Sequence, residues 1–317
     1  MRHRLVVALV ALICSLGASF VRSYRVKKVG EYPNYLALSP DGRTAYVTSY
    51  RTGDLIAVDL SQRLITRSVS VGSSPLGLAL ADGGKTAFVA CKDSGTVAVV
   101  DLETFRVEAN IKVAGSPNAV AIGPRGYRAF VTNFGRSKEG QLHIIDIRDR
   151  NIIATMKMGV APIALVVSPV SELVYVVNGA SNEVWVVNPD RQSVTEKIGV
   201  GDAPDGIAIT PDGKRLFVSN SRTNDVTVID TQLNTVLVTI PGFKSPFGVA
   251  VSGDGKRLVV VNTASRTISV LPADLSSLDS KSFEVDKGPT DVKIAPDNHT
   301  VVVVNEQSHS LVIGEIP

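Results

Sequence analysis

The chain has 317 residues, of which 44% are hydrophobic and 20% charged, which is the composition of a globular protein with a substantial core. Its formal net charge of +3 excludes the strong basic excess of a dedicated nucleic-acid-binding protein. Two cysteines, Cys14 and Cys91, do not make a disulfide scaffold, because Cys14 lies in an N-terminal segment of different character.

That N-terminal segment, residues 1–19, has the features of a secretory signal peptide. Arg2 and Arg4 precede an apolar run at residues 5–16, and small residues follow up to Ser19. Cleavage near Ser19 would place the mature chain outside the cytoplasm, as a secreted or periplasmic protein. An uncleaved membrane anchor is the alternative. No later segment is long and apolar enough to span a membrane.

The rest of the chain is a repeat, which is clearest in residues 203–244. This unit holds four apolar runs of strand length, at residues 206–210, 215–220, 226–230 and 235–240. Pro211, Asp212 and Gly213 mark the first turn, because proline presets φ, Asp bonds its own backbone and glycine accepts positive φ. Short runs rich in Val and Ile between such turns predict an antiparallel sheet of four strands.

The unit recurs along the whole chain. The proline that opens it returns every 42 to 45 residues, at Pro33, Pro75, Pro117, Pro162, Pro204, Pro246 and Pro289. In chain order, the last four residues of the second run in each unit are YVTS, FVAC, FVTN, YVVN, FVSN, VVVN and VVVN. A four-stranded unit with a period in the low forties is typical of a propeller blade. We therefore predict an all-β, seven-bladed β-propeller as a single domain over residues 23–317.

The two ends of the repeat are complementary. The seventh unit stops after its third run, at Pro317, whereas residues 25–33 align with the strand that precedes each of the other prolines. The N-terminal strand should therefore complete the last blade as its fourth antiparallel strand. Such closure removes an exposed sheet edge.

The FVTN, YVTS and YVVN segments, each after a turn such as SPDG or GPRG, resemble the YVTN-repeat β-propeller family. The resemblance covers nearly all of the chain after residue 19. Relatives of this type include surface-layer-associated propellers, propellers linked to quinone-dependent oxidation, and envelope proteins. The resemblance implies the fold and does not by itself imply a reaction.

A propeller binds ligands at the mouth of its central channel, where two loops of each blade meet. One loop carries the opening proline and the other follows the YVTN segment, and loops on a rigid scaffold are where function concentrates. These loops supply the candidate ligand-binding residues Asn34, Tyr50, Arg51, Lys92, Asn118, Phe134, Arg136, Asp205, Arg222, Arg266 and His309. Their cations favour a small anionic ligand, an acidic polymer or an envelope protein as partner, although acids in the same loops bring the local charge near zero.

Motifs for enzyme chemistry are missing from the sequence. It has four histidines, and only His309 falls in a mouth loop. No Cys/His cluster has zinc spacing, no C-x-x-C-H run could attach haem, and no G-x-S-x-G elbow occurs. We therefore predict no catalytic residue, no metal site and no cofactor.

Three functions follow, in order of preference. The first is a non-catalytic binding or scaffold protein of the cell envelope, a monomer because the ring closes on itself. The second is a hydrolase or lyase that resembles the lactonase-type propellers and needs His309, an arginine and either Asp205 or Glu306 together. The third is single-stranded nucleic-acid binding by loop cations and aromatics, which must weaken steeply with salt. The near-neutral charge disfavours this third function.

Overall fold

The computed structural model describes residues 19–113, 115–134 and 139–317. The predicted signal peptide therefore lies outside the described residues except for Ser19. Arg136 lies outside them as well. Of the described residues, none belongs to a helix with the length and apolarity needed to cross a bilayer.

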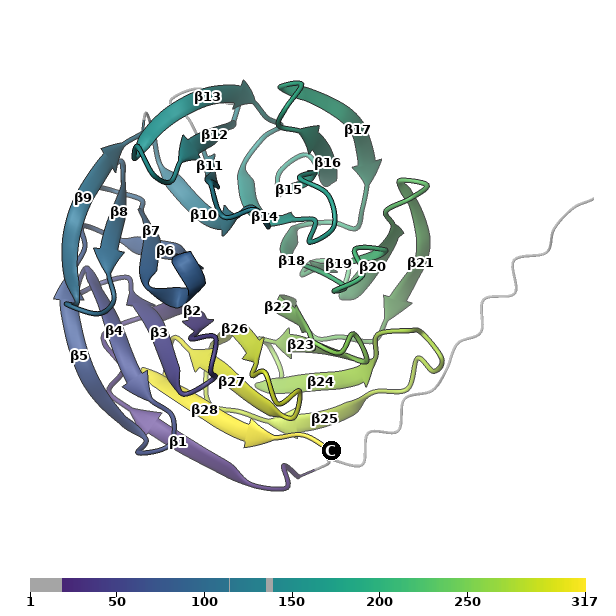
Figure 1. Cartoon of the computed structure of the whole chain (residues 1–317). Coiled ribbons are helices and arrows are strands. Elements are labelled where there is room, and N and C mark those ends of the chain that lie inside the picture. The colour runs from purple at the N-terminus through teal and green to yellow at the C-terminus, as the bar shows by residue number, and fades with distance from the viewer. Residues whose placement is uncertain (1–18, 114, 135–138) are drawn as a thin grey trace, which may run out of the picture.

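The described residues form seven four-stranded antiparallel sheets arranged as blades around one axis (Figure 1). The innermost strands are β2 (Pro33–Leu38), β6 (Pro75–Ala81), β10 (Pro117–Ile122), β14 (Pro162–Val167), β18 (Pro204–Ile209), β22 (Pro246–Val251) and β26 (Pro289–Ile294). The second strands are β3 (Thr44–Ser49), β7 (Thr86–Cys91), β11 (Arg128–Asn133), β15 (Val174–Asn178), β19 (Arg215–Asn220), β23 (Arg257–Asn262) and β27 (Thr300–Asn305).

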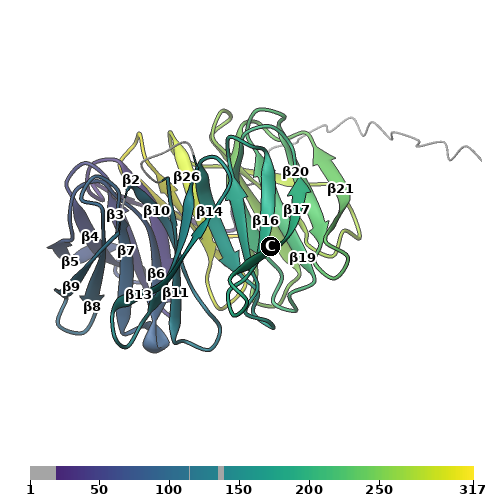
Figure 2. The ribbon, with the colours of Figure 1, turned by 90° about the horizontal axis from the view of Figure 1, so that it is seen from above.

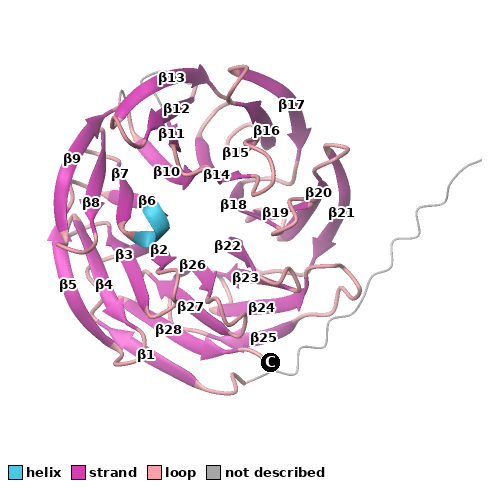
Figure 3. Cartoon of the chain, in the orientation of Figure 1, coloured by secondary structure: helices cyan, strands magenta, loops and turns pink. Residues whose placement is uncertain are grey.

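The two outer positions complete each blade. The third strands are β4 (Asp54–Asp59), β8 (Thr96–Asp101), β12 (Gln141–Asp146), β16 (Glu183–Asn188), β20 (Asp225–Asp230), β24 (Thr267–Pro272) and β28 (Ser310–Glu315). The outermost strands are β5 (Leu64–Ser70), β9 (Arg106–Lys112), β13 (Asn151–Lys157), β17 (Ser193–Gly199), β21 (Thr235–Pro241), β25 (Lys281–Glu284) and β1 (Ser23–Lys27). A single turn of 3₁₀ helix, Asp82–Gly84, is the one helical element among the described residues (Figure 3).

The predicted closure is confirmed, because β1 is the outermost strand of the last blade. It pairs antiparallel with β28 from Ser23 opposite Gly314 to Lys27 opposite Ser310. Figure 1 shows this pair as a purple strand beside a yellow one. The fold class, seven blades of four antiparallel strands closed by the N-terminal strand, is thus as the repeat predicted.

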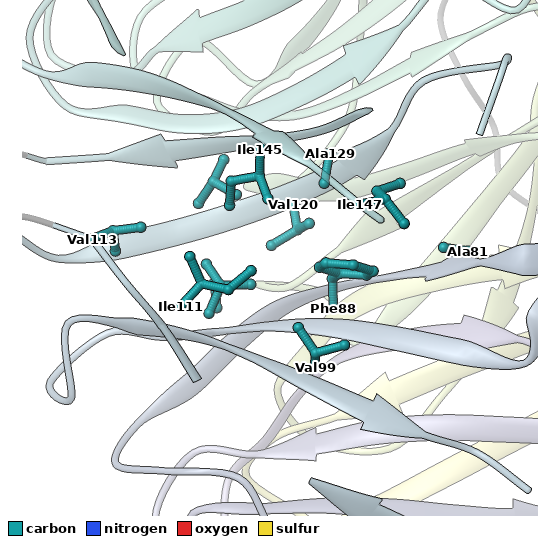
Figure 4. Close-up of a cluster of buried hydrophobic side chains, with 12 residues drawn as sticks. Ala81, Phe88, Val99, Ile111, Val113, Val120, Ala129, Ile145 and Ile147 are labelled. Atoms are coloured by element: carbon teal, nitrogen blue, oxygen red, sulfur yellow. The ribbon is translucent and has the colours of Figure 1, made fainter. Parts of the chain in front are cut away.

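The hydrophobic core lies between the blades. The buried apolar side chains of the described residues form seven clusters, and each cluster joins two neighbouring blades. Figure 4 shows the cluster between the second and third blades, where Phe88 and Ile111 face Ala129 and Ile145. Each blade thus buries both of its faces, which a single four-stranded sheet could not do alone.

The loops at the strand ends form two faces (Figure 2). We call one the mouth face: it carries the loops that lead into the innermost strands and the loops between the second and third strands. The side chain that ends each second strand is buried beneath this face, as Ser49, Cys91, Asn133, Asn178, Asn220, Asn262 and Asn305. Several of these side chains fix the loops; the Ser49 hydroxyl, for example, accepts a hydrogen bond from the Glu31 amide at 2.8 Å.

In the third blade this network includes a buried histidine. His143 is 2% exposed, and its Nε2 lies 2.9 Å from Asn133 Nδ2 while its Nδ1 lies 2.9 Å from Thr155 Oγ1. Because an amide NH2 only donates, Nε2 accepts and the proton sits on Nδ1, which donates to Thr155. Burial lowers the pKa of His143 to about 4.

Candidate functional site

A cavity of about 240 Å³ lies on the ring axis. Residues of all seven innermost strands line it, and most of them are glycine, alanine, valine, leucine or isoleucine. The polar exceptions come from three blades and are Tyr35, Asp205, Thr290, Asp291 and Lys293. We call this space the channel cavity.

The innermost strands place polar groups here through a break in their pairing. In every pair of first and second strands the register shifts just after the opening proline. Such a bulge bends the strand and re-aims the side chain at the break. Asp205 in β18 and Thr290 in β26 occupy this position, directly after their prolines.

Asp291 and Lys293 form an ion pair inside the channel cavity. Lys293 Nζ lies 2.8 Å from Asp291 Oδ1 and 3.0 Å from Oδ2. The same carboxylate accepts the backbone amides of Leu36 at 3.0 Å and Val292 at 2.9 Å. Asp291 is 6% exposed, so its charge is compensated by one ammonium and two amides.

Asp205 has no such compensation. Burial raises the pKa of its carboxyl above the usual value, and the only opposing contribution is a hydrogen bond from the Ser221 side chain. Of the described lysines and arginines, none forms an ion pair with it. Asp205 is therefore a carboxylate that faces the channel cavity with its charge unmatched.

The charges of both acids act on the hydroxyl of Tyr35. Burial, followed by the charges of Asp291 and Asp205, raises the pKa of the Tyr35 hydroxyl far above its usual range. The phenol therefore stays protonated at any physiological pH. Tyr35 is one of the residues that line the channel cavity.

A second group, which we call the rim cluster, lies on the mouth face where the last blade meets the first. The His309 and Tyr32 rings are 5.4 Å apart, and the Arg51 guanidinium lies 5.5 Å from the centre of the Tyr32 ring. Arg51 Nε is 3.9 Å from Glu31 Oε2. Burial raises the pKa of Glu306, against the influence of the Asn34 side chain and of His309. The rim cluster thus comprises Glu31, Tyr32, Asn34, Arg51, Glu306 and His309.

Of the other predicted site residues, Tyr50 adjoins the rim cluster, since its backbone amide donates to the Tyr32 carbonyl at 3.1 Å, and the other described ones belong to neither group. Arg222 is paired with Asp202 at 3.0 Å, and Lys92 lies 6.0 Å from the centre of the Phe134 ring. Arg266 is exposed on its own blade. Asn118 is buried and donates to the Ile163 carbonyl at 2.8 Å, which ties the third blade to the fourth. Tyr50 lines a shallow polar groove of about 460 Å³ between the first two blades.

The sequence reasoning missed Tyr35 and Lys293. Both residues stand out when the seven repeats are aligned on their opening prolines. Two residues after the opening proline the blades carry Tyr35, Gly77, Ala119, Ala164, Gly206, Gly248 and Asp291. Four residues after it they carry Ala37, Ala79, Ala121, Val166, Ala208, Ala250 and Lys293. At both positions the other blades have a small or aliphatic side chain. The exceptions Tyr35, Asp291 and Lys293 all line the channel cavity.

The comparison with protein families agrees with this architecture. The family described as YNCE-like beta-propeller matches residues 159–313, which span the fourth blade to most of the seventh. The chain is a YVTN-type β-propeller. No curated protein matches its sequence.

Solved structures extend the comparison of this YVTN-type propeller to the whole ring. A chain of Kuenenia stuttgartiensis hydrazine synthase superposes with a TM-score of 0.82. The match covers 92% of this chain and 97% of that one, at 22% sequence identity. At that identity the likeness shows the shared fold alone. In the part of this YVTN-type propeller that the structure describes, no group of three His, Cys, Asp or Glu side chains could hold a metal ion.

Proposed function

We propose that this YVTN-type propeller is a non-catalytic binding protein of the cell envelope, and that its ligand enters through the mouth face into the channel cavity. The observation that carries the proposal is the cavity itself, an apolar space on the ring axis with a few convergent polar groups. Ligand sites have this character, and typical ones measure roughly 300–1,000 Å³. A cavity of about 240 Å³ therefore favours a small ligand.

The N-terminal segment supports a location outside the cytoplasm, with the propeller either released after cleavage or held by an anchor. The closed ring supports a monomer. The mouth-face loops around the rim cluster remain free for an envelope protein, which is the scaffold form of the same proposal.

A thermal-shift screen tests the proposal. A ligand that binds only the folded protein stabilises it by about 2.7 kcal/mol at a hundred times its Kd, so a hit must raise the melting temperature. We expect a hit among small polar molecules that disappears in Asp205→Asn. The matched control is Arg222→Ala, which alters a mouth-face side chain outside the channel cavity and should leave the shift intact.

The opposite pattern of results in the two variants would assign the binding site to another part of the protein. A hit that Arg222→Ala removes and Asp205→Asn retains would place binding on the loops. An absence of any small-molecule hit would contradict the channel proposal, and capture of an envelope partner that survives in Asp205→Asn would then support the scaffold role.

The rim cluster supports a second candidate, a propeller hydrolase. It brings His309, Glu306 and Arg51 to one corner of the mouth face, which is the combination that an acid–base reaction would need. Because Arg51 is exposed and lies against Glu31 and Tyr32, we expect no turnover of lactones or esters above background. Turnover that falls at least 100-fold in His309→Asn, with an unchanged melting temperature, would replace the binding proposal with this one.

The arrangement of charges weighs against nucleic-acid binding. Arg51 and Arg222, two of the cations on which that prediction depends, have acidic partners on the mouth face. A cation that is already paired with a carboxylate neutralises a phosphate less well. Its binding to a nucleic acid therefore releases fewer counterions from the phosphate backbone.

A further inference from the structure

The lining of the channel cavity contains more acidic than basic side chains. The lining residues that carry an acidic or basic group at neutral pH are Asp205, Asp291 and Lys293. Lys293 contacts both oxygens of Asp291, so this pair is internally neutral. The carboxylate of Asp205 is left without a cation, and burial penalises its charged form. A positively charged ligand would remove that penalty, whereas an anion would increase it.

Other lining residues of the channel cavity suit an organic cation. Tyr35 and Phe247 line the same cavity. The face of an aromatic ring is negative, and it attracts an ammonium group within about 6 Å of its centre. The remaining lining is aliphatic, as in Leu78, Val120 and Leu165, and could cover alkyl groups attached to the ammonium.

The volume argues against a bare metal ion. A cavity of about 240 Å³ has room for several water molecules. A hard cation would need several oxygen ligands at about 2–2.6 Å, whereas the Asp291 oxygens are engaged by Lys293 and two amides. A molecule of about six to ten heavy atoms with one positive charge fits both the size and the charge.

We propose that the channel cavity binds a small organic ammonium cation, with the Asp205 carboxylate paired to the ammonium and the Tyr35 and Phe247 rings against its substituents. This inference rests on the proposed channel-binding function and specifies its ligand class. It differs from the anionic ligand that the mouth-loop cations suggested, because two of those cations are paired with acids and the channel beneath them is negative.

Titration calorimetry with a matched pair of probes tests the inference on the unaltered protein. Choline carries a quaternary ammonium, and 3,3-dimethylbutan-1-ol has the same shape with a neutral carbon in place of nitrogen. We expect choline, or a smaller methylated ammonium, to bind at least tenfold more tightly than the neutral isostere. Binding should weaken at least tenfold in Asp205→Asn. Asp202→Asn is the control, because Asp202 is a mouth-face carboxylate paired with Arg222 outside the channel cavity, and it should change the affinity less than twofold.

Two outcomes would overturn the inference, and they are distinguishable. Equal affinity for the neutral isostere, lost in a channel variant such as Phe247→Ala, would refute the ammonium assignment and leave the channel-binding function standing. Failure of choline, tetramethylammonium, methylammonium and ethanolamine to bind would also refute it, and the thermal-shift screen would then decide the channel function separately. The comparison of the two probes uses the unaltered protein, so it does not depend on any variant folding.

Discussion

Deletion of residues 23–29 is expected to lower the free energy of unfolding by more than about 4 kcal/mol and to open the ring. The deletion removes β1, the outermost strand of the last blade, together with Val26 and Val29, which are 5% and 0% exposed in the cluster that joins the last blade to the first. Burying one such side chain contributes about 1.5–3 kcal/mol, and a typical domain has only about 5–15 kcal/mol in total. Urea unfolding followed by circular dichroism measures the change.

The control for this deletion lies in the same strand. Lys27 is exposed, so Lys27→Ser should change the unfolding free energy by less than about 0.5 kcal/mol. The deleted protein should also expose the edge of β28, and a peptide of residues 20–30 added in excess should restore part of the lost stability. A deletion variant as stable as the full ring would show that β1 does not close it.

The second large effect concerns pH. Acidification from pH 7 to pH 4 is expected to remove up to about 3 kcal/mol of stability through His143 alone. Its pKa in the folded protein is about 4, whereas a histidine in the unfolded chain has a pKa of about 6.5. Between these values the unfolded state binds the extra proton, so this stability is fully present above about pH 6.5, declines as the pH falls, and is gone below about pH 4. Protonation of Nε2 would also break its hydrogen bond with Asn133.

The repeat itself supplies the matched variant for this measurement. The position of His143 is held by Thr227 in the fifth blade, where Thr227 Oγ1 accepts the Asn220 side-chain amide at 2.8 Å. His143→Thr should therefore keep an acceptor for Asn133 and lose the titration. The difference in unfolding free energy between the two proteins, measured at pH 7 and again at pH 4, isolates the histidine from the carboxylates. If this difference does not change with pH, His143 is not the group responsible.

The fold could be predicted from the sequence because the information is repeated. Each blade carries its own proline, turn and YVTN segment, and the missing strand at one end matches the extra strand at the other. The candidate site could be predicted only in part, because it depends on what differs between blades. Loop cations such as Arg222 and Arg51 drew the prediction to the mouth, where the structure gives them acidic neighbours.

Two features of the site depend on tertiary neighbours that alignment of one repeat with another does not reveal. His309 and Tyr32 are far apart in sequence and meet only because the ring closes. The inward direction of Asp205 depends on the register shift after Pro204, which is a feature of strand pairing. Tyr35 and Lys293, by contrast, could have been found from their size at positions where other blades are small.

The lining of the channel cavity has a consequence for how ligand preference can evolve in such a ring. Some lining residues also belong to the clusters between blades, as Leu36, Leu78 and Leu165 do, whereas Asp205 and Lys293 belong to none of them. A lineage could therefore exchange an inward side chain of the second kind, and with it the preferred ligand, while the seven clusters keep their residues. Not every lining position allows such an exchange. At Gly77 and Gly248 an added Cβ would lie 2.7 Å and 2.6 Å from the backbone of the innermost strand in the following blade. Selectivity in this ring can therefore evolve mainly in the blades that have room for a side chain, and the first, fifth and seventh blades already place a polar side chain in the cavity lining.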